Sequence, residues 1–158
     1  MQLELVPPER VGPIMIGMDF DAAQRELVSL PGYRPPALGR RVEPGFAHYD
    51  SEMSISVYPE RDQVKAIEIF RPEEEDSVVY RGISLFELPA DQVIEALSTT
   101  ESLDIVRGGE FVVAPELLLA LSRPHLPAGP DDEDGRYFES VLIAAPGYYL
   151  GPDGRPVY

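Results

Sequence analysis

The sequence predicts an α+β fold built from two tandem copies of a helix packed on an antiparallel β-meander. Each half contains one amphipathic helical stretch, and alternating apolar and polar residues follow that stretch. The order of these elements is the same in both halves. A chain of 158 residues is long enough for one ordinary domain or for two small modules that share a core.

The first helix is expected after a short strand at residues 13–16. Asp19 is a good N-cap, because its carboxylate can accept a hydrogen bond from a free backbone amide one turn further on. Ala23 and Leu27 then lie on one helical face, and the sequence Leu-Pro-Gly at residues 30–32 ends the helix.

Two strands are expected after a loop rich in proline and arginine. Residues 53–58 and 64–70 each alternate between apolar and polar side chains, and a polar turn at 59–63 separates them. This spacing predicts an antiparallel hairpin whose apolar side packs on the helix. The residues expected to face the helix are Ile55, Val57, Ile67 and Ile69.

The second half repeats this order with changes in loop length. An offset of 70 residues aligns the two helices, and offsets of 64 and 74 align the two pairs of strands. The segment PELLLAL (115–121) has helical propensity, but it aligns with the strand region at 51–57. We therefore expect a strand at residues 117–122.

This duplication sets the expected domain organisation. The first α+β repeat covers residues 1–72, an acidic linker covers 73–79, and the second repeat covers 80–158. The two halves differ in length only in their loops, and the alternation of apolar and polar residues in the strands is the same in both. A duplicated fold requires this. Pro-Asp-Gly turn chemistry in the tail, residues 148–158, predicts a terminal hairpin in the second repeat.

The composition is strongly acidic. Asp and Glu outnumber Lys and Arg by 28 to 13, which gives a formal net charge of −15. This charge disfavours nucleic acid and anionic membranes as partners, and it would speed the capture of a basic protein. The two acidic runs, at 73–76 and 131–134, are expected to be solvated loops.

The sequence contains no recognisable catalytic or metal-binding motif. It has no cysteine, and its two histidines, His48 and His125, occupy non-equivalent positions in the two halves. We therefore expect no metal and no cofactor, and we favour a non-enzymatic role. The start of the chain lacks the features of a secretory signal, and no apolar run is long enough to span a bilayer, so we expect a cytoplasmic protein.

The outward face of the first hairpin and one loop supply the candidate binding residues. The second half is more apolar on this face, which favours its burial against the tail hairpin, the other repeat or a second chain, or its use in protein binding. The loop at 34–41 is the only basic cluster, so its arginines are expected to contact a peptide or carboxylate, or else to pair with nearby acids. The predicted partner-binding residues are Ser54, Ser56, Tyr58, Glu68, Phe70, Arg40 and Arg41.

Residues 13–27, PIMIGMDFDAAQREL, resemble the start of the small modules of bacterial outer-membrane assembly lipoproteins, which also occur in tandem in beta-lactamase inhibitor protein. Gly17, Met18 and Asp19 stand where those modules have Gly-Met and a capping residue, whereas the second half has Glu-Leu in place of Gly-Met. The resemblance implies two helix-on-sheet modules whose sheets adjoin in one concave protein-binding surface. It does not imply a particular target, because a fold does not fix a function.

Together these patterns predict a non-enzymatic protein-binding module, most concretely a cytosolic inhibitor or immunity-type protein. The expected partner is another protein, with a basic one favoured by the charge. The alternatives are a small enzyme or small-molecule binder that uses the cleft between the repeats, and a structural homo-oligomer. A pocket with convergent polar groups and a carboxylate of raised pKa would favour the enzyme, and a monomer in solution would exclude the oligomer.

Overall fold

The computed structural model describes residues 1–158 and has an α+β fold with mostly antiparallel strands. Its strands and helices, in chain order, are β1 (Gln2–Val6), β2 (Arg10–Val11), β3 (Ile14–Met15), α1 (Phe20–Ser29), β4 (Tyr33–Arg34), β5 (Phe46–Tyr49), β6 (Ser54–Glu60), β7 (Gln63–Phe70), β8 (Ser77–Tyr80), β9 (Ile83–Ser84), α2 (Ala90–Ser98), β10 (Asp104–Val106), β11 (Phe111–Ala114), β12 (Leu119–Ser122), α3 (Glu133–Arg136) and β13 (Ser140–Ala144).

The main sheet has eight strands in the order β10-β11-β12-β13-β7-β6-β5-β4. Strands β7 and β13 pair antiparallel at its centre, so that four strands from each half of the chain form one continuous sheet. A five-stranded sheet in the order β3-β2-β1-β8-β9 contains the one parallel pair, β1 with β8. This strand order is symmetric about the β7–β13 pair, as a duplication would produce; the two-copy arrangement itself stays a prediction.

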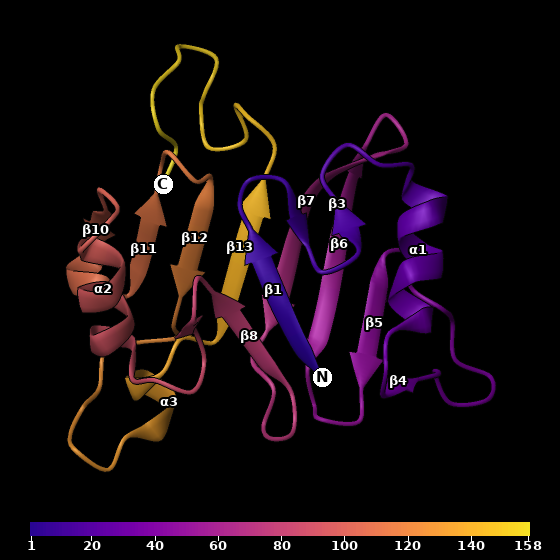
Figure 1. The fold of residues 1–158 in the computed structure, drawn as a ribbon, viewed down its shortest axis with the longest axis horizontal. Helices are drawn as coiled ribbons and strands as arrows, with labels where there is room; N and C mark the ends of the chain where they lie inside the picture. The colour runs from indigo at the N-terminus through magenta and orange to yellow at the C-terminus, as the bar shows by residue number, and fades with distance from the viewer.

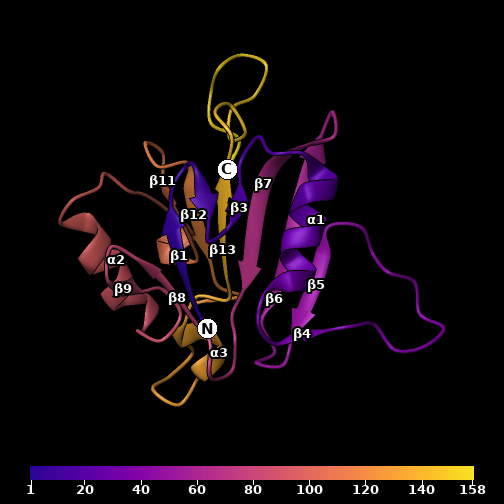
Figure 2. The same ribbon diagram turned by 45° about the vertical axis from the view of Figure 1, so that its right-hand side comes forward.

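Helices α1 and α2 lie on either side of β1 and β8, and all four elements cover the same face of the main sheet (Figures 1 and 2). A single core fills the space between these layers. The apolar residues that the alternation assigns to this face are all at most 3 % exposed: Ile55, Val57, Ile67 and Ile69. Their burial confirms which residues of β6 and β7 were predicted to face the helix.

The first helix begins where the capping signal predicts. The Asp19 side chain accepts a hydrogen bond from the amide of Ala22 at 3.0 Å, which satisfies one of the free amides of the first turn. The buried residues of α1 are Ala23 and Leu27. The second helix has Pro89 at the N-cap position and no side-chain cap, so burial of its apolar face holds it in place.

The structure differs from the predicted strands in two ways: some strands were not predicted, and others are shorter than predicted. Strands β1 and β8 were not expected, and β8 begins at Ser77, inside the predicted linker 73–79. The strand predicted at 117–122 begins only at Leu119, because Leu118 has a φ of 52° and lies in the turn after β11. The strand expected at 13–16 is reduced to the two residues of β3.

The tail folds back on the face of the sheet opposite the helices. Its hairpin is closed by hydrogen bonds from the Gly151 amide to the Arg155 carbonyl and from the Val157 amide to the Tyr149 carbonyl, at 2.8 and 2.9 Å. Tyr149 packs there in a second small cluster with Ala66, Val113, Ala120 and Ala144. The tail hairpin, one of the coverings considered, therefore lies over part of the apolar half of this face.

Candidate functional site

The candidate site lies on the part of the main sheet that faces away from the helices, in strands β4 to β7. We call this surface the open face. Cross-strand pairs place its side chains together, since residues opposite each other in an antiparallel pair point to the same side. The open face consists of Arg34, Phe46, His48, Ser54, Ser56, Tyr58, Glu68 and Phe70.

The open face brings together all five predicted strand residues. Ser54 pairs with Phe70, and Ser56 pairs with Glu68, in neighbouring strands. Tyr58 is 39 % exposed, and its hydroxyl donates to Glu68 Oε1 at 2.7 Å. Burial of the ring, and then the hydrogen bond to the Glu68 carboxylate, raises the pKa of Tyr58 to about 12, so the phenol is neutral at physiological pH.

Phe46 belongs to this surface although the sequence analysis did not include it. It lies opposite Ser56 in the β5–β6 pair, and its ring is 39 % exposed. Its position depends on the register of β5, for which the sequence contains only a short alternating run. The open face therefore carries two half-exposed aromatic residues, Phe46 and Tyr58, with Ser56 next to both.

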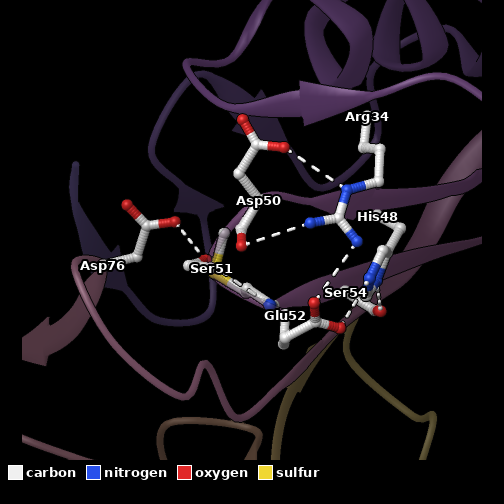
Figure 3. A network of polar contacts seen from close by, with 8 residues as sticks. Arg34, His48, Asp50, Ser51, Glu52, Ser54 and Asp76 are labelled. Atoms are coloured by element: carbon white, nitrogen blue, oxygen red, sulfur yellow. Dashed lines mark hydrogen bonds and ion pairs between the residues drawn. The ribbon is translucent and has the colours of Figure 1, made fainter.

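A polar network fixes one end of the open face (Figure 3). Arg34 contacts the carboxylates of Asp50 and Glu52, each at 3.3 Å. His48 lies between Glu52 Oε2, at 3.1 Å from Nε2, and Ser54 Oγ, at 2.8 Å from Nδ1. Hydrogen bonds from Arg34 and then from His48 lower the pKa of Glu52. The sequence analysis did not foresee this contact between His48 and Glu52.

The charge state of Glu52 determines how the His48 ring is hydrogen-bonded. An ionised carboxylate only accepts hydrogen bonds, so Nε2 of His48 must donate to it. In the neutral imidazole, Nδ1 then accepts from the Ser54 hydroxyl. The network thus holds five side chains, from β4, β5, β6 and the turn before β6, in one geometry, which lowers the entropy cost of binding at this surface.

A cleft lies between the loop 35–45 and the neighbouring strands β4 and β5. We call it the cationic cleft. Its volume is about 360 Å³, and it is lined by Arg34, Arg40, Arg41, Val42, Phe46 and His48, among others. The loop projects from the edge of the sheet near α1 (Figures 1 and 2). Arg40 and Arg41 therefore lie beside the strand residues of the open face, rather than among them.

The arginines of this loop differ in their partners. Arg34 is held by two carboxylates, whereas neither Arg40 nor Arg41 forms an ion pair with an acidic side chain. The expectation that nearby acids pair with the loop arginines is therefore correct for Arg34 and wrong for the other two.

Gly45 anchors the base of this loop, and we predict that Gly45→Ala destabilises the protein. Its φ is 75°, and an added Cβ would lie 2.5 Å from the Val57 carbonyl oxygen and 2.9 Å from the Phe20 ring. We expect the free energy of unfolding to fall by about 3 kcal/mol in urea titrations. Gly39→Ala is the matched control, because Gly39 has a φ of 83° with nothing near its added Cβ. Equal losses in the two variants would contradict the close approach at Gly45.

A second cleft lies at the end of the main sheet where β7 ends and β13 begins, so both halves of the chain line it. Its volume is about 540 Å³, and no apolar side chain other than Pro72 lines it; the remaining residues are Glu52, Arg71, Glu73, Glu133, Asp134 and Glu139. We call it the acidic cleft. Burial raises the pKa of Glu139 even though Arg71 opposes the shift. No group of three or more acidic, histidine or cysteine side chains is arranged to hold a metal ion.

The acidic runs are more structured than expected. Asp132 caps α3 by accepting from the Gly135 amide at 3.3 Å, and it also accepts from the Ala128 amide and contacts His125. The Ala128 amide and then His125 lower the pKa of Asp132. Asp76 accepts a hydrogen bond from the Ser51 hydroxyl. The expectation of two simple solvated loops was therefore wrong for these two side chains.

Comparisons with family models, curated proteins and solved structures find no match to this chain. The resemblance to the outer-membrane assembly modules consequently stays an expectation. None of the helices has both the length and the apolar character that crossing a bilayer requires.

Proposed function

We propose that this protein is a non-enzymatic protein-binding module that uses the open face, most concretely a cytoplasmic inhibitor or immunity-type protein. One observation carries the proposal. The helices and β1 and β8 pack on one face of the main sheet, while the opposite face in β4 to β7 leaves Phe46 and Tyr58 each 39 % exposed among polar side chains.

The composition of the open face suits a protein partner. Aromatic side chains supply much contact area with few rotatable bonds, and such residues dominate the binding energy of protein interfaces. Ser56 lies opposite Phe46 and two residues from Tyr58 in the same strand, and its hydroxyl offers adaptable hydrogen bonding. The hydrogen bond from Tyr58 to Glu68 limits the motion of one ring before binding.

The charge distribution favours a basic partner. The protein has a formal net charge of −15, and the acidic cleft adjoins the open face through Glu52. A basic surface would be drawn to this region, and the association rate would fall as salt screens the attraction.

The alternatives predict different outcomes. A small enzyme or small-molecule binder would use the acidic cleft, where Glu139 has the raised pKa that such a site requires. A homo-oligomer would bury the open face against a second copy, and light scattering would then give a multiple of 17.5 kDa. The protein-binding proposal expects a monomer.

The proposal is tested by capturing partners from the lysate of the source organism with three tagged proteins. The wild type should retain one stoichiometric protein, and we expect the double variant Phe46→Lys/Tyr58→Lys to retain at least about tenfold less of it. Val28→Lys is the matched control, because Val28 is a 50 % exposed apolar residue on α1, away from the open face. It should bind as the wild type does.

Two results would contradict the proposal. One is equal retention by the double variant and the wild type. The other is a wild-type protein that retains no partner, whatever the salt concentration. Circular dichroism of both variants shows whether the fold is intact, so a loss of binding is assigned to the surface.

A further inference from the structure

We propose that the cationic cleft is a binding site for a small organic carboxylate, in which a single negative charge is attached to an apolar body. This inference goes beyond protein binding and does not depend on it. It rests on the size of the cleft, on two arginines without acidic partners and on the apolar side chains among the lining residues.

The cleft has the dimensions of a small-molecule site. Its volume of about 360 Å³ falls in the usual range of ligand pockets, roughly 300–1,000 Å³. Pro35, Val42 and Phe46 contribute apolar surface to the lining, and the half-exposed Phe46 ring can stack on an aromatic or aliphatic body.

The lining of the cleft also carries positive charge. Arg40 and Arg41 are exposed and make no ion pair, although acidic residues outnumber basic ones by 28 to 13 in this chain. A guanidinium group presents paired N–H donors that match both oxygens of a carboxylate. Arg34 does not supply this charge, because Asp50 and Glu52 already hold its guanidinium group.

The same lining favours a monoanion over a dianion. Glu43 is the one carboxylate in the cleft, and the protein as a whole is strongly negative. A dianionic phosphate would therefore meet more repulsion than a carboxylate with one charge. The site matches an arylalkyl or aliphatic carboxylate.

The cleft is largely formed before a ligand binds. Pro35 and Pro36 restrict the backbone where the loop leaves β4. At the other end, the Gly45 carbonyl accepts from the Val57 amide at 2.7 Å, and its amide donates to Gln24 Oε1 at 3.3 Å. Less conformational entropy is then lost when the site is occupied.

The test is a titration of the ¹⁵N-labelled protein with 3-phenylpropionate, followed by amide chemical shifts. We expect saturable shifts confined to residues 33–48, with a Kd on the order of 1 mM for so small a probe. The neutral analogue 3-phenylpropionamide should cause no saturable shift, and phenyl phosphate should bind more weakly. The double variant Arg40→Gln/Arg41→Gln should weaken 3-phenylpropionate binding at least about tenfold.

The matched control is Arg61→Gln/Arg81→Gln, which removes two other exposed arginines that form no ion pair. It should bind the carboxylate as the wild type does. Shifts of equal size with the amide, shifts scattered over the surface, or binding that survives in the Arg40→Gln/Arg41→Gln variant would overturn the proposal. Tighter binding of phenyl phosphate would overturn the preference for a monoanion. None of these outcomes bears on partner capture by the open face, so the two proposals fail separately.

Discussion

Arg123→Ala is expected to lower the free energy of unfolding by about 3–5 kcal/mol. The Arg123 residue is 5 % exposed, and its guanidinium group donates to the carbonyls of Gly109 and Gly135 at 3.0 and 3.1 Å. It also contacts Asp91 of α2 at 3.1 Å and lies 5.7 Å from the centre of the Phe138 ring. Arg123 directly follows β12, and its side chain thus joins the end of that strand to α2, to α3 and to the turn at Arg107–Gly109.

The loss arises chiefly from the two carbonyl groups. Gly109 and Gly135 are buried, so their carbonyls would have no hydrogen-bond donor once the guanidinium group is removed. Asp91 contributes little, since its side chain is 81 % exposed and water replaces the lost contact. Arg123→Lys should cost less than the alanine variant, because one ammonium group retains part of the hydrogen bonding.

Urea unfolding followed by circular dichroism measures this effect. Arg107→Ala is the matched control, because the Arg107 side chain is 63 % exposed and its pair with Glu110, at 3.7 Å, lies on the surface. We expect that variant to lose less than about 1 kcal/mol. If Arg123→Ala and Arg107→Ala unfold at the same urea midpoint with the same slope, Arg123 does not hold these segments together.

The second large effect is expected at Tyr149 in the tail. Replacing this tyrosine by phenylalanine should change the free energy of unfolding in the opposite direction to the same replacement at Tyr49 in β5. Tyr149 is 9 % exposed in the cluster under the tail, and its hydroxyl has no hydrogen-bond partner. Tyr149→Phe should therefore raise the free energy of unfolding by about 1 kcal/mol. Tyr149→Ala should lower it by about 3–4 kcal/mol, because it leaves a cavity between the tail and the sheet.

Tyr49→Phe is the control for the hydroxyl group. Tyr49 is fully buried, and its hydroxyl donates to the Leu27 carbonyl at 2.7 Å. The same chemical change should here lower the free energy of unfolding by about 1–2 kcal/mol. Thermal and urea unfolding of both phenylalanine variants provide the comparison, and a shift of the same sign in both would contradict the assignment of the Tyr149 hydroxyl as unpaired.

The sequence predicts those parts of the fold that local signals determine. The Asp19 cap and the spacing of Ala23 and Leu27 place α1 correctly. Alternation with a period of two predicts the buried and outward residues of β6 and β7, including the turn between them, where Arg61 and Asp62 adopt φ values of 53° and 63°.

The missed elements depend on pairings between distant segments. Strand β1 has an alternating sequence, but its burial depends on its parallel partner β8, which lies more than seventy residues later. Strand β10 has three residues and is separated from β11 by a turn at Arg107–Gly109, so neither strand shows a long periodic run. The extent of β12 depends on Leu118, whose left-handed conformation no local signal predicts.

In the candidate site, too, the residues set by local alternation were predicted, and the contacts that depend on strand pairing were missed. Alternation was sufficient to place Ser54, Ser56 and Tyr58 on one face, because all three lie in one strand. The contacts of His48 with Glu52 and Ser54 were missed, since they require the β5–β6 register and a turn in which Glu52 has a φ of 67°. The tail could be predicted as a hairpin from its turn sequence, but the sequence did not show that this hairpin packs on the apolar half of the sheet.

Hydroxyl-radical footprinting of the captured complex tests the central proposal most directly. We predict that partner binding lowers the oxidation of Phe46 and Tyr58, while Met15, which is 51 % exposed in β3 away from the open face, reacts as in the free protein. Protection of Met15 with unchanged oxidation of Phe46 and Tyr58 would contradict it, because the partner would then bind the small-sheet side and not the open face.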